Sequence, residues 1–198
     1  MRGAGVLKKA IIAFLLLAFS PAPAPCGPEA GGTAPDFSLF GADYRYHELS
    51  EYLARPAVRA AVIIFTSNHC PISLEYDEEL IKLANKYQRD GFAFIAINPH
   101  PAGADPASEF RLILKRVEEK NFPYPYVYDG NKGAAGSYGV RVTPEVFIVG
   151  RGRRVLYRGA VDNLGGEPFY LIEALEDILA GRPVRTPRSM PLGCIIDP

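Results

Sequence analysis

The sequence predicts a single α/β domain, built on a central mixed sheet of about five strands with helices on both faces. Two observations predict this class. Apolar runs of strand length alternate with amphipathic stretches of helical period, as parallel crossover connections require. The chain also has 198 residues, 48% of them hydrophobic, which is enough for one buried core and too little for two ordinary domains.

Residues 1–20 are expected to be a secretory signal peptide. Three basic residues, Arg2, Lys8 and Lys9, precede an apolar run at 10–19, which is the layout of such a peptide. The run is too short to span a bilayer comfortably, since a transmembrane helix needs about 20 apolar residues. We therefore expect a periplasmic or secreted protein, with an uncleaved N-terminal anchor as the alternative.

Residues 21–33 are rich in Pro, Gly and Ala and are expected to be a linker that does not order itself. Cys26 lies within it, but the residues before Cys26 do not form a convincing lipidation motif. We accordingly expect membrane contact only if the N-terminal segment stays uncleaved or becomes lipidated. The folded domain should start at Ala34 and extend to residue 181.

The first strand is expected at 37–40, on an edge of the sheet, and the central strand at 59–66. The central strand contains a continuous apolar run at 60–65, which is typical of a strand buried on both faces. A helix then follows Cys70 as far as residue 89. Apolar residues recur at helical spacing up to Gly91, a residue suited to ending a helix.

The alternation continues in the second half of the domain. A buried strand is expected at 92–97, an amphipathic helix at 106–120 and a short strand at 124–128. Residues 145–149 and 155–158 flank a turn rich in Gly and Arg, and they are expected to form an antiparallel hairpin.

The last helix is expected at 168–180, and the Pro-rich tail at 182–198 should lie extended over the surface and carry Cys194. The chain has three cysteines, of which only Cys70 and Cys194 certainly remain after removal of a signal peptide. Two cysteines are too few for a disulfide scaffold, so they indicate reactivity instead.

The charge balance excludes one class of partner. Lys and Arg total 22 and Asp and Glu total 22, so the net charge is zero. Such a chain has no overall field that attracts nucleic acid or anionic lipid. We expect no nucleic-acid partner and, with three scattered histidines, no metal site.

Three motifs occur in order along the domain: Ala-Pro-Asp-Phe-Ser-Leu at 34–39, Phe-Thr-Ser-Asn-His-Cys-Pro-Ile-Ser at 65–73 and Thr-Pro-Glu-Val-Phe at 143–147. Together they make the chain similar to the redoxin and peroxiredoxin-like branch of the thioredoxin superfamily. This resemblance implies a thioredoxin-like fold and a thiol oxidoreductase that acts on peroxide or a protein disulfide. The chain has no flavin or nicotinamide fingerprint, so we expect no bound cofactor and a thiol protein or small thiol as reductant.

Cys70 is the expected nucleophile. A cysteine between a buried strand and a helix lies at the helix N-terminus, where unpaired backbone N–H groups favour the thiolate. The resemblance implies that Thr143 and Pro144 form a loop with a cis peptide bond that faces Cys70; an ordinary trans proline is the alternative. We expect Pro71, Thr143 and Pro144 to form the substrate site, where the backbone binds a peptide or small thiol.

The sequence also departs from the patterns that it resembles. Ser73 stands where a thioredoxin has its second cysteine, and Ile64 stands where it has a buried acid. A local disulfide is therefore excluded. Ser67 fits the hydroxyl position of a peroxiredoxin, but Ile63 replaces the proline of that pattern, and Arg141 is the nearest candidate for the activating arginine.

Cys194 is expected to be the resolving cysteine, which attacks an oxidised Cys70; the alternative is a small buried apolar side chain. His69 either assists the thiol or is only a solvated or packed imidazole. The expected catalytic set is Cys70, Cys194, Ser67, Ser73 and His69. The rival to an enzyme is a non-catalytic thioredoxin-like module that binds a peptide or envelope partner through the Pro144 face.

Overall fold

The computed structural model describes residues 27–99, 101 and 103–196. The expected signal peptide, the first part of the expected linker and Cys26 lie outside the described residues. Within the described part, no helix is long and apolar enough to cross a membrane.

A mixed sheet of seven strands forms the centre of the described part, in the order β2-β1-β5-β4-β3-β7-β8. The expected number of about five strands is therefore too small. One additional edge strand, β2, is a short polar segment that hydrophobic patterning does not mark. The strands are β1 (Ser38–Gly41), β2 (Tyr46–Glu48), β3 (Ala60–Phe65), β4 (Phe92–Pro99), β5 (Tyr126–Asp129), β7 (Glu145–Gly150) and β8 (Val155–Gly159).

β3 is the central strand, as its apolar run predicts. All its side chains are fully buried, and they alternate between the two hydrophobic clusters on the two sides of the sheet. It pairs parallel with β4 and antiparallel with β7. Because parallel strands need a crossover connection, the chain must leave the sheet after β3 and return through a helix.

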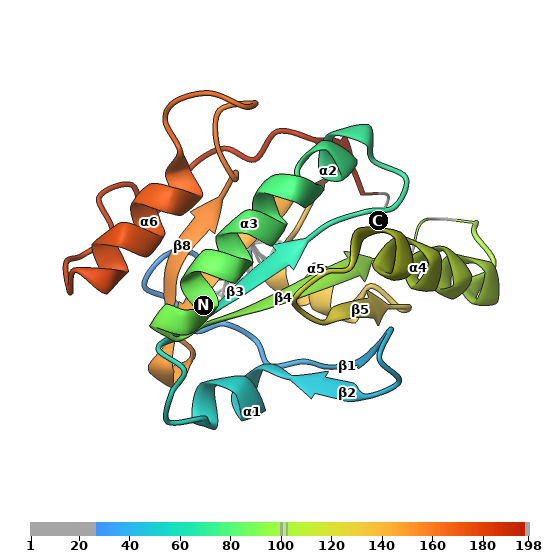
Figure 1. Ribbon diagram of the computed structural model, residues 1–198, viewed down its shortest axis with the longest axis horizontal. Coiled ribbons are helices and arrows are strands. Elements are labelled where there is room, and N and C mark those ends of the chain that lie inside the picture. Colours follow the sequence, from blue (N-terminus) through green and yellow to red (C-terminus); the bar gives the residue numbers. More distant parts are fainter. Residues whose placement is uncertain (1–26, 100, 102, 197–198) are drawn as a thin grey trace, which may run out of the picture.

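Helices cover both faces of the sheet (Figure 1). One face packs against α3 (Asp77–Tyr87), α4 (Pro106–Lys120) and α6 (Tyr170–Leu179), and the other against α1 (Leu49–Ala54) and α5 (Gly133–Tyr138). The single helix expected after Cys70 is divided into α2 (Pro71–Glu75) and α3. It ends through a short 3-10 turn at Gly91, whose φ of 89° favours glycine.

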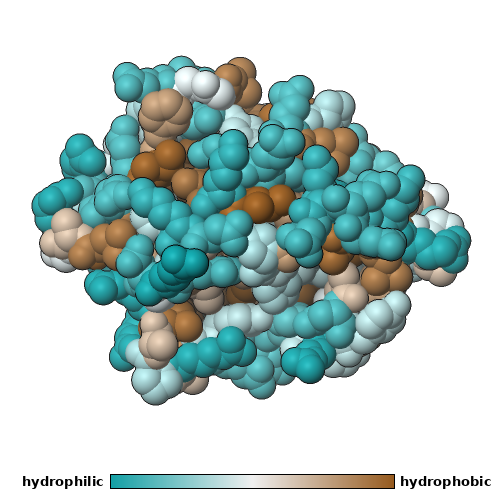
Figure 2. Space-filling model, viewed as in Figure 1, coloured by the Kyte–Doolittle hydropathy of each residue, from teal (hydrophilic) through white to brown (hydrophobic). Residues whose placement is uncertain are grey.

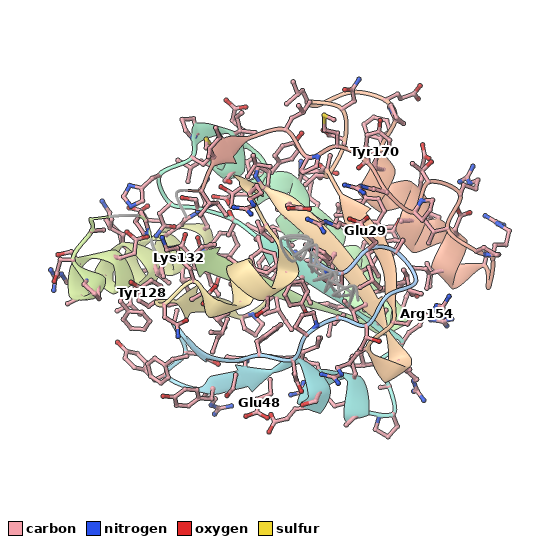
Figure 3. All side chains as sticks on the ribbon, turned by 180° about the vertical axis from the view of Figure 1, so that it is seen from behind. Glu29, Glu48, Tyr128, Lys132, Arg154 and Tyr170 are labelled. Carbon is pink, nitrogen blue, oxygen red and sulfur yellow. A yellow bond between two sulfur atoms is a disulfide. The ribbon has the colours of Figure 1, made fainter. Side chains whose placement is uncertain are left out.

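The described part of the expected linker, residues 27–33, is ordered against β8. The N–H of Gly31 donates to the carbonyl of Val155 at 2.8 Å, and the N–H of Val155 donates to the carbonyl of Gly32 at 2.9 Å. Glu29, labelled in Figure 3, forms an ion pair with Arg188 at 2.9 Å. Backbone pairing with a strand edge thus orders a segment that lacks the apolar residues to order itself.

The tail is fixed to the domain as far as Ser189. The N–H of Arg158 in β8 donates to the carbonyl of Pro187, and the N–H of Ser189 donates back to the carbonyl of Arg158, both at 3.1 Å. Ser189 passes so close to Gly159 that a Cβ there would lie 2.2 Å from its Oγ. The tail is therefore paired with β8 at this point.

Asp177 on α6 holds the start of the tail. Its carboxylate is buried and accepts hydrogen bonds from the side chains of Arg185 and Arg182, both at 2.9 Å, and from the N–H of Arg185 at 3.0 Å. These hydrogen bonds, that of Arg185 foremost, lower the pKa of Asp177 from 3.8 to about 2.

Asp177→Asn is expected to lower thermal stability at neutral pH and to remove part of the acid sensitivity. A carboxylate whose pKa is lower in the folded state stabilises the protein above its unfolded pKa, and that contribution disappears as the pH falls from about 4 to about 2. Thermal unfolding of both proteins across this range measures it. Equal pH dependence in the two proteins would contradict the assignment.

Candidate active site

Cys70 lies where the chain leaves the central strand and enters α2. β3 ends at Phe65, and Cys70 is the N-cap residue of α2, with extended backbone angles. Its carbonyl accepts a hydrogen bond from the N–H of Leu74 at 3.1 Å. Pro71 occupies the first helical turn, where its fixed φ suits a helix and its missing N–H leaves no donor unpaired.

Cys70 and Cys194 are joined by a disulfide bond across a sequence separation of 124 residues, with their Cα atoms 5.7 Å apart. This distance lies within the usual range for a disulfide. Cys70 is fully buried, whereas Cys194 is only partly buried. The tail therefore reaches the residue that the sequence marks as the nucleophile.

A small second sheet holds Cys194 in place. β9 (Cys194–Ile195) pairs antiparallel with β6 (Val142–Thr143), with Thr143 opposite Cys194. The N–H of Ile196 extends the pairing by donating to the carbonyl of Arg141 at 2.8 Å.

The loop of Thr143 and Pro144 faces the disulfide. The peptide bond between these two residues is cis, and the carbonyl oxygen of Thr143 lies 3.2 Å from Cys70 Sγ. Thr143 itself is almost fully buried. The loop therefore places a backbone carbonyl, and the edge of a short strand, directly beside the sulfur of Cys70.

The loop before Cys70 is held by Asn68. Its side-chain oxygen accepts hydrogen bonds from Arg116 at 3.0 Å and from the hydroxyl of Tyr126 at 2.8 Å. Burial raises the pKa of Tyr126 well above its usual value, so its hydroxyl remains a donor at neutral pH. Ser67 accepts the N–H of His69 on its Oγ at 3.1 Å, which places its hydroxyl within the same loop.

The His69 ring is directed towards α4. Its Nε2 lies 2.7 Å from Oε2 of Glu109, a buried carboxylate that also accepts a hydrogen bond from Asn98 at 2.7 Å. No hydrogen bond of the described residues joins this ring to Cys70. The proposed assistance of Cys70 by His69 therefore stays a prediction.

Glu109 and Arg116 are two polar residues of this site that the sequence reasoning did not single out. They share the buried face of α4 with Ile113, because positions four and three residues apart lie on one side of a helix. Two charged residues on the apolar face of an amphipathic helix are a feature of the sequence by which a buried polar site can be predicted. Such residues need a partner when they are buried.

Ser73 lies one helical turn after Cys70. It is almost fully buried, and its Oγ has no hydrogen-bond partner among the described residues. Its carbonyl accepts a hydrogen bond from Arg116 at 3.4 Å. A catalytic role for Ser73 stays a prediction, like that of Ser67.

Two cavities open near Cys70. The smaller, of about 190 Å³, brings together five of the expected site residues; it is lined by Ser67, His69, Cys70, Pro99, Pro101, Thr143, Cys194, Ile195 and Ile196. The larger, of about 340 Å³, lies between α3 and α6 and includes Ile72 but neither cysteine. Exposed apolar residues, Leu164 and Phe169, border it, and apolar patches interrupt the hydrophilic surface of this face (Figure 2).

The described residues contain no group of three or more His, Cys, Asp or Glu side chains that is arranged to hold a metal ion.

Comparisons with known proteins identify the family and the fold of the chain. The model of the family described as Redoxin matches residues 29–171. A conserved protein from Geobacillus kaustophilus is 32% identical, with 85% of this chain and 91% of that chain covered and a TM-score of 0.76. No curated protein matches the sequence.

Two further structures have the same fold at lower identity. One is described as a thiol:disulfide interchange protein DsbE from Chlorobium tepidum; it is 24% identical, with 78% and 98% of the two chains covered and a TM-score of 0.60. The other is the peroxidoxin BcpB from Mycobacterium tuberculosis, 21% identical, with 78% and 99% covered and a TM-score of 0.62. These likenesses confirm the predicted α/β fold.

Proposed function

Because the chain belongs to the redoxin family and has a thioredoxin-like fold, we propose that it is an exported thiol-dependent oxidoreductase with Cys70 as nucleophile and Cys194 as resolving thiol. Membership confirms the resemblance carried by the three motifs. A thioredoxin-like redox role follows from the family; the residues, the substrate and export are our proposal. The observation that carries it is the disulfide between Cys70 and Cys194.

The cycle begins with the reduced protein. The Cys70 thiolate attacks one sulfur of a substrate disulfide, so that a mixed disulfide forms and the first substrate thiolate leaves. The Cys194 thiolate then attacks the Cys70 sulfur, and the second substrate thiolate leaves. Two electrons have passed to the substrate, and the protein holds the Cys70–Cys194 disulfide. A thiol protein or small thiol reduces this disulfide and closes the cycle.

The position of Cys70 supports its role as nucleophile and as leaving group. As the N-cap residue of α2, it lies next to the N–H groups of the first helical turn, which favour a thiolate. The neighbouring Thr143 carbonyl cannot donate a hydrogen bond to a thiolate, and in the disulfide form Cys70 Sγ makes no capping hydrogen bond with α2. The proposal is that the N–H groups of this turn stabilise the thiolate in the reduced protein.

The course of the tail supports the role of Cys194. Pairing with Arg158 fixes the tail as far as Ser189, and a short, partly exposed stretch at 190–193 leads from there to Cys194. When the disulfide opens, this short tether keeps Cys194 close to Cys70. Short tethers give effective concentrations on the order of millimolar, which favours rapid resolution.

A disulfide substrate is better supported than a peroxide. The edge of β6 beside Cys70 pairs with an extended strand, as recognition of a polypeptide requires. For peroxide, Arg141 is the nearest candidate in the sequence for an activating arginine, yet none of the described residues that line the cavity at Cys70 is an arginine. Exposure of the reduced protein to hydrogen peroxide distinguishes the two, since a peroxidase would form the Cys70–Cys194 disulfide without any disulfide substrate.

Cys194→Ala is expected to trap the mixed disulfide between Cys70 and the substrate. The first exchange should proceed within about threefold of the wild-type rate, since Cys194 acts only in the second step. Mass spectrometry of the protein during turnover detects the adduct. Cys26→Ser serves as control and should turn over normally; an absence of adduct in Cys194→Ala would refute the resolving role.

The rival function, a binding module that uses the Pro144 face, is favoured by the same pairing of β6 with a strand. Such a module tolerates Cys70→Ser without losing its partner, whereas the oxidoreductase loses covalent capture of a substrate. Pull-down with Cys194→Ala and with the double variant that also carries Cys70→Ser separates the two functions. An oxidoreductase retains partners only when Cys70 is present, and a reductant releases them. A binding module retains the same partners in both variants.

Export is supported by the basic and apolar pattern of residues 1–20. Cell fractionation of the full chain tests it. Processed protein in the periplasm or medium is the expected result, and full-length protein confined to the cytoplasm would exclude export.

A further inference from the structure

We propose that the tail is a built-in copy of the polypeptide substrate, so that the edge of β6 selects partner segments with glycine directly before the cysteine. The inference deepens the proposed function and rests on it. Residues 193–196, Gly-Cys-Ile-Ile, occupy in the oxidised protein the place that a partner takes in the mixed disulfide. The partner segment is therefore expected to match the requirements that this place imposes on the tail.

The tail binds as an added strand. Thr143 and Cys194 are directly opposite one another, Val142 is opposite Ile195, and the N–H of Ile196 donates to the carbonyl of Arg141. Main-chain pairing of this kind accepts any extended segment and obtains its selectivity from the side chains. A partner cysteine bonded to Cys70 Sγ in the register of Cys194 would use the same main-chain groups.

The position before the cysteine has no room for a side chain. A Cβ on Gly193 would lie 1.9 Å from the carbonyl oxygen of Thr143, 2.6 Å from its carbonyl carbon and 3.1 Å from the nitrogen of Pro144. These are backbone atoms of the loop beside Cys70, where the same Thr143 oxygen lies 3.2 Å from Cys70 Sγ. The loop cannot yield without moving the atoms that surround the reacting sulfur.

The two positions after the cysteine impose weaker requirements. Ile195 is 80% exposed, so its place accepts many side chains. Ile196 is partly buried and packs against the hydrophobic cluster on the α1 and α5 side of the sheet. The segment that fits is thus Gly-Cys, then any residue, then an apolar residue.

The tail and the partner compete for the edge of β6, so cleavage of the mixed disulfide by Cys194 is coupled to dissociation of the partner. In the mixed disulfide the partner is bonded to Cys70 and paired with β6, while the tail is displaced beyond its anchor at Ser189. When Cys194 attacks the Cys70 sulfur, the Cys70–partner bond breaks and the partner leaves as a thiolate. The returning tail takes the β6 edge at the same time, so the product loses its covalent bond and its strand pairing together.

The test uses two peptides, Leu-Gly-Cys-Ile-Ile and Leu-Ala-Cys-Ile-Ile. Each is activated as a mixed disulfide with an aromatic thiol, and the absorbance of the released thiol measures the rate. The reduced protein carries Cys26→Ser and Cys194→Ala, so that Cys70 is its only cysteine and the adduct is retained. We expect Cys70 to react with the glycine peptide at least about tenfold faster, equivalent to about 1.4 kcal/mol. A control with free cysteine in place of the protein should show equal rates.

Glutathione disulfide serves as a third substrate, because it tests the reactivity of the Cys70 thiol without requiring the substrate to pair with β6 as a strand. If glutathione disulfide reacts with Cys70 and the two peptides react equally fast, the selectivity proposal fails while the proposed function stands. If none of the three forms an adduct at Cys70, both fail.

A second variant tests the same clash within the chain. Gly193→Ala should lower the fraction of protein that holds the Cys70–Cys194 disulfide in a given glutathione buffer. Gly166→Ala is the matched control, since a Cβ there would lie 3.6 Å from the carbonyl oxygen of Asn163, an ordinary contact distance, and it should leave that fraction unchanged. Equal fractions in wild type and Gly193→Ala would contradict the proposal.

Discussion

Cys70→Ala is expected to abolish thiol–disulfide exchange, with the rate falling by a factor on the order of 10³ or more, as removal of a covalent nucleophile does. Cys70 forms the first bond to the substrate, and Cys194 cannot replace it. Cys194 lies on the tail, where it is partly buried and pairs with the short strand β6. It lacks the N-cap position that favours a thiolate at Cys70.

The measurement is the rate at which reduced protein cleaves a peptide disulfide. Cys26→Ser should retain the wild-type rate. Circular dichroism should show that Cys70→Ala has the same helix and strand content as the wild type. A folded Cys70→Ala protein that keeps more than about a tenth of the activity would exclude Cys70 as the nucleophile.

Arg116→Met is expected to lower the free energy of unfolding by about 3–5 kcal/mol, the cost of leaving a buried charge without its partner. Arg116 binds both carboxylate oxygens of Asp77, at 2.5 and 3.2 Å, and both side chains are buried. It also donates to Asn68, in the loop before Cys70, at 3.0 Å. The variant therefore removes a bond that ties this loop to α3 and α4.

Urea denaturation measures the loss. Lys115→Met is the matched control, because Lys115 is exposed and its only described ion pair, with Glu119, has an N–O distance of 3.7 Å; a change within about 0.5 kcal/mol is expected. Addition of Asp77→Asn should recover part of the stability of Arg116→Met, since the buried carboxylate that Arg116 pairs with is then neutral. A loss no larger than that of Lys115→Met would contradict the account.

The backbone of the fold follows from local sequence. The apolar run at 60–65 predicts a strand buried on both sides, and β3 is that strand. Helical spacing predicts α4 with the bounds that the structure has, Pro106–Lys120. Local patterns miss β2, a polar strand at Tyr46–Glu48 that pairs with β1 and buries only its middle side chain, His47. They also miss the two short helices α1 and α5.

The site is less accessible to sequence reasoning because its groups meet only through the fold. Cys70 could be singled out from its place between a buried strand and a helix. The pairing of Cys70 with Cys194 depends on where the tail runs along β8, and that course is set by backbone bonds to Arg158. Likewise Glu109 reaches His69 only because α4 packs beside the loop that precedes Cys70.

In the proposed function, Cys70 and Cys194 exchange between dithiol and disulfide while the substrate is reduced. The most direct test of this exchange is peptide mass mapping of the reduced protein, with free thiols blocked at successive times after addition of a stoichiometric disulfide peptide. We expect the Cys70–Cys194 linked peptide to appear in step with substrate thiols and to disappear on addition of a thiol reductant. If substrate thiols appear while Cys70 and Cys194 are both still found as free thiols in the samples, the exchange is excluded.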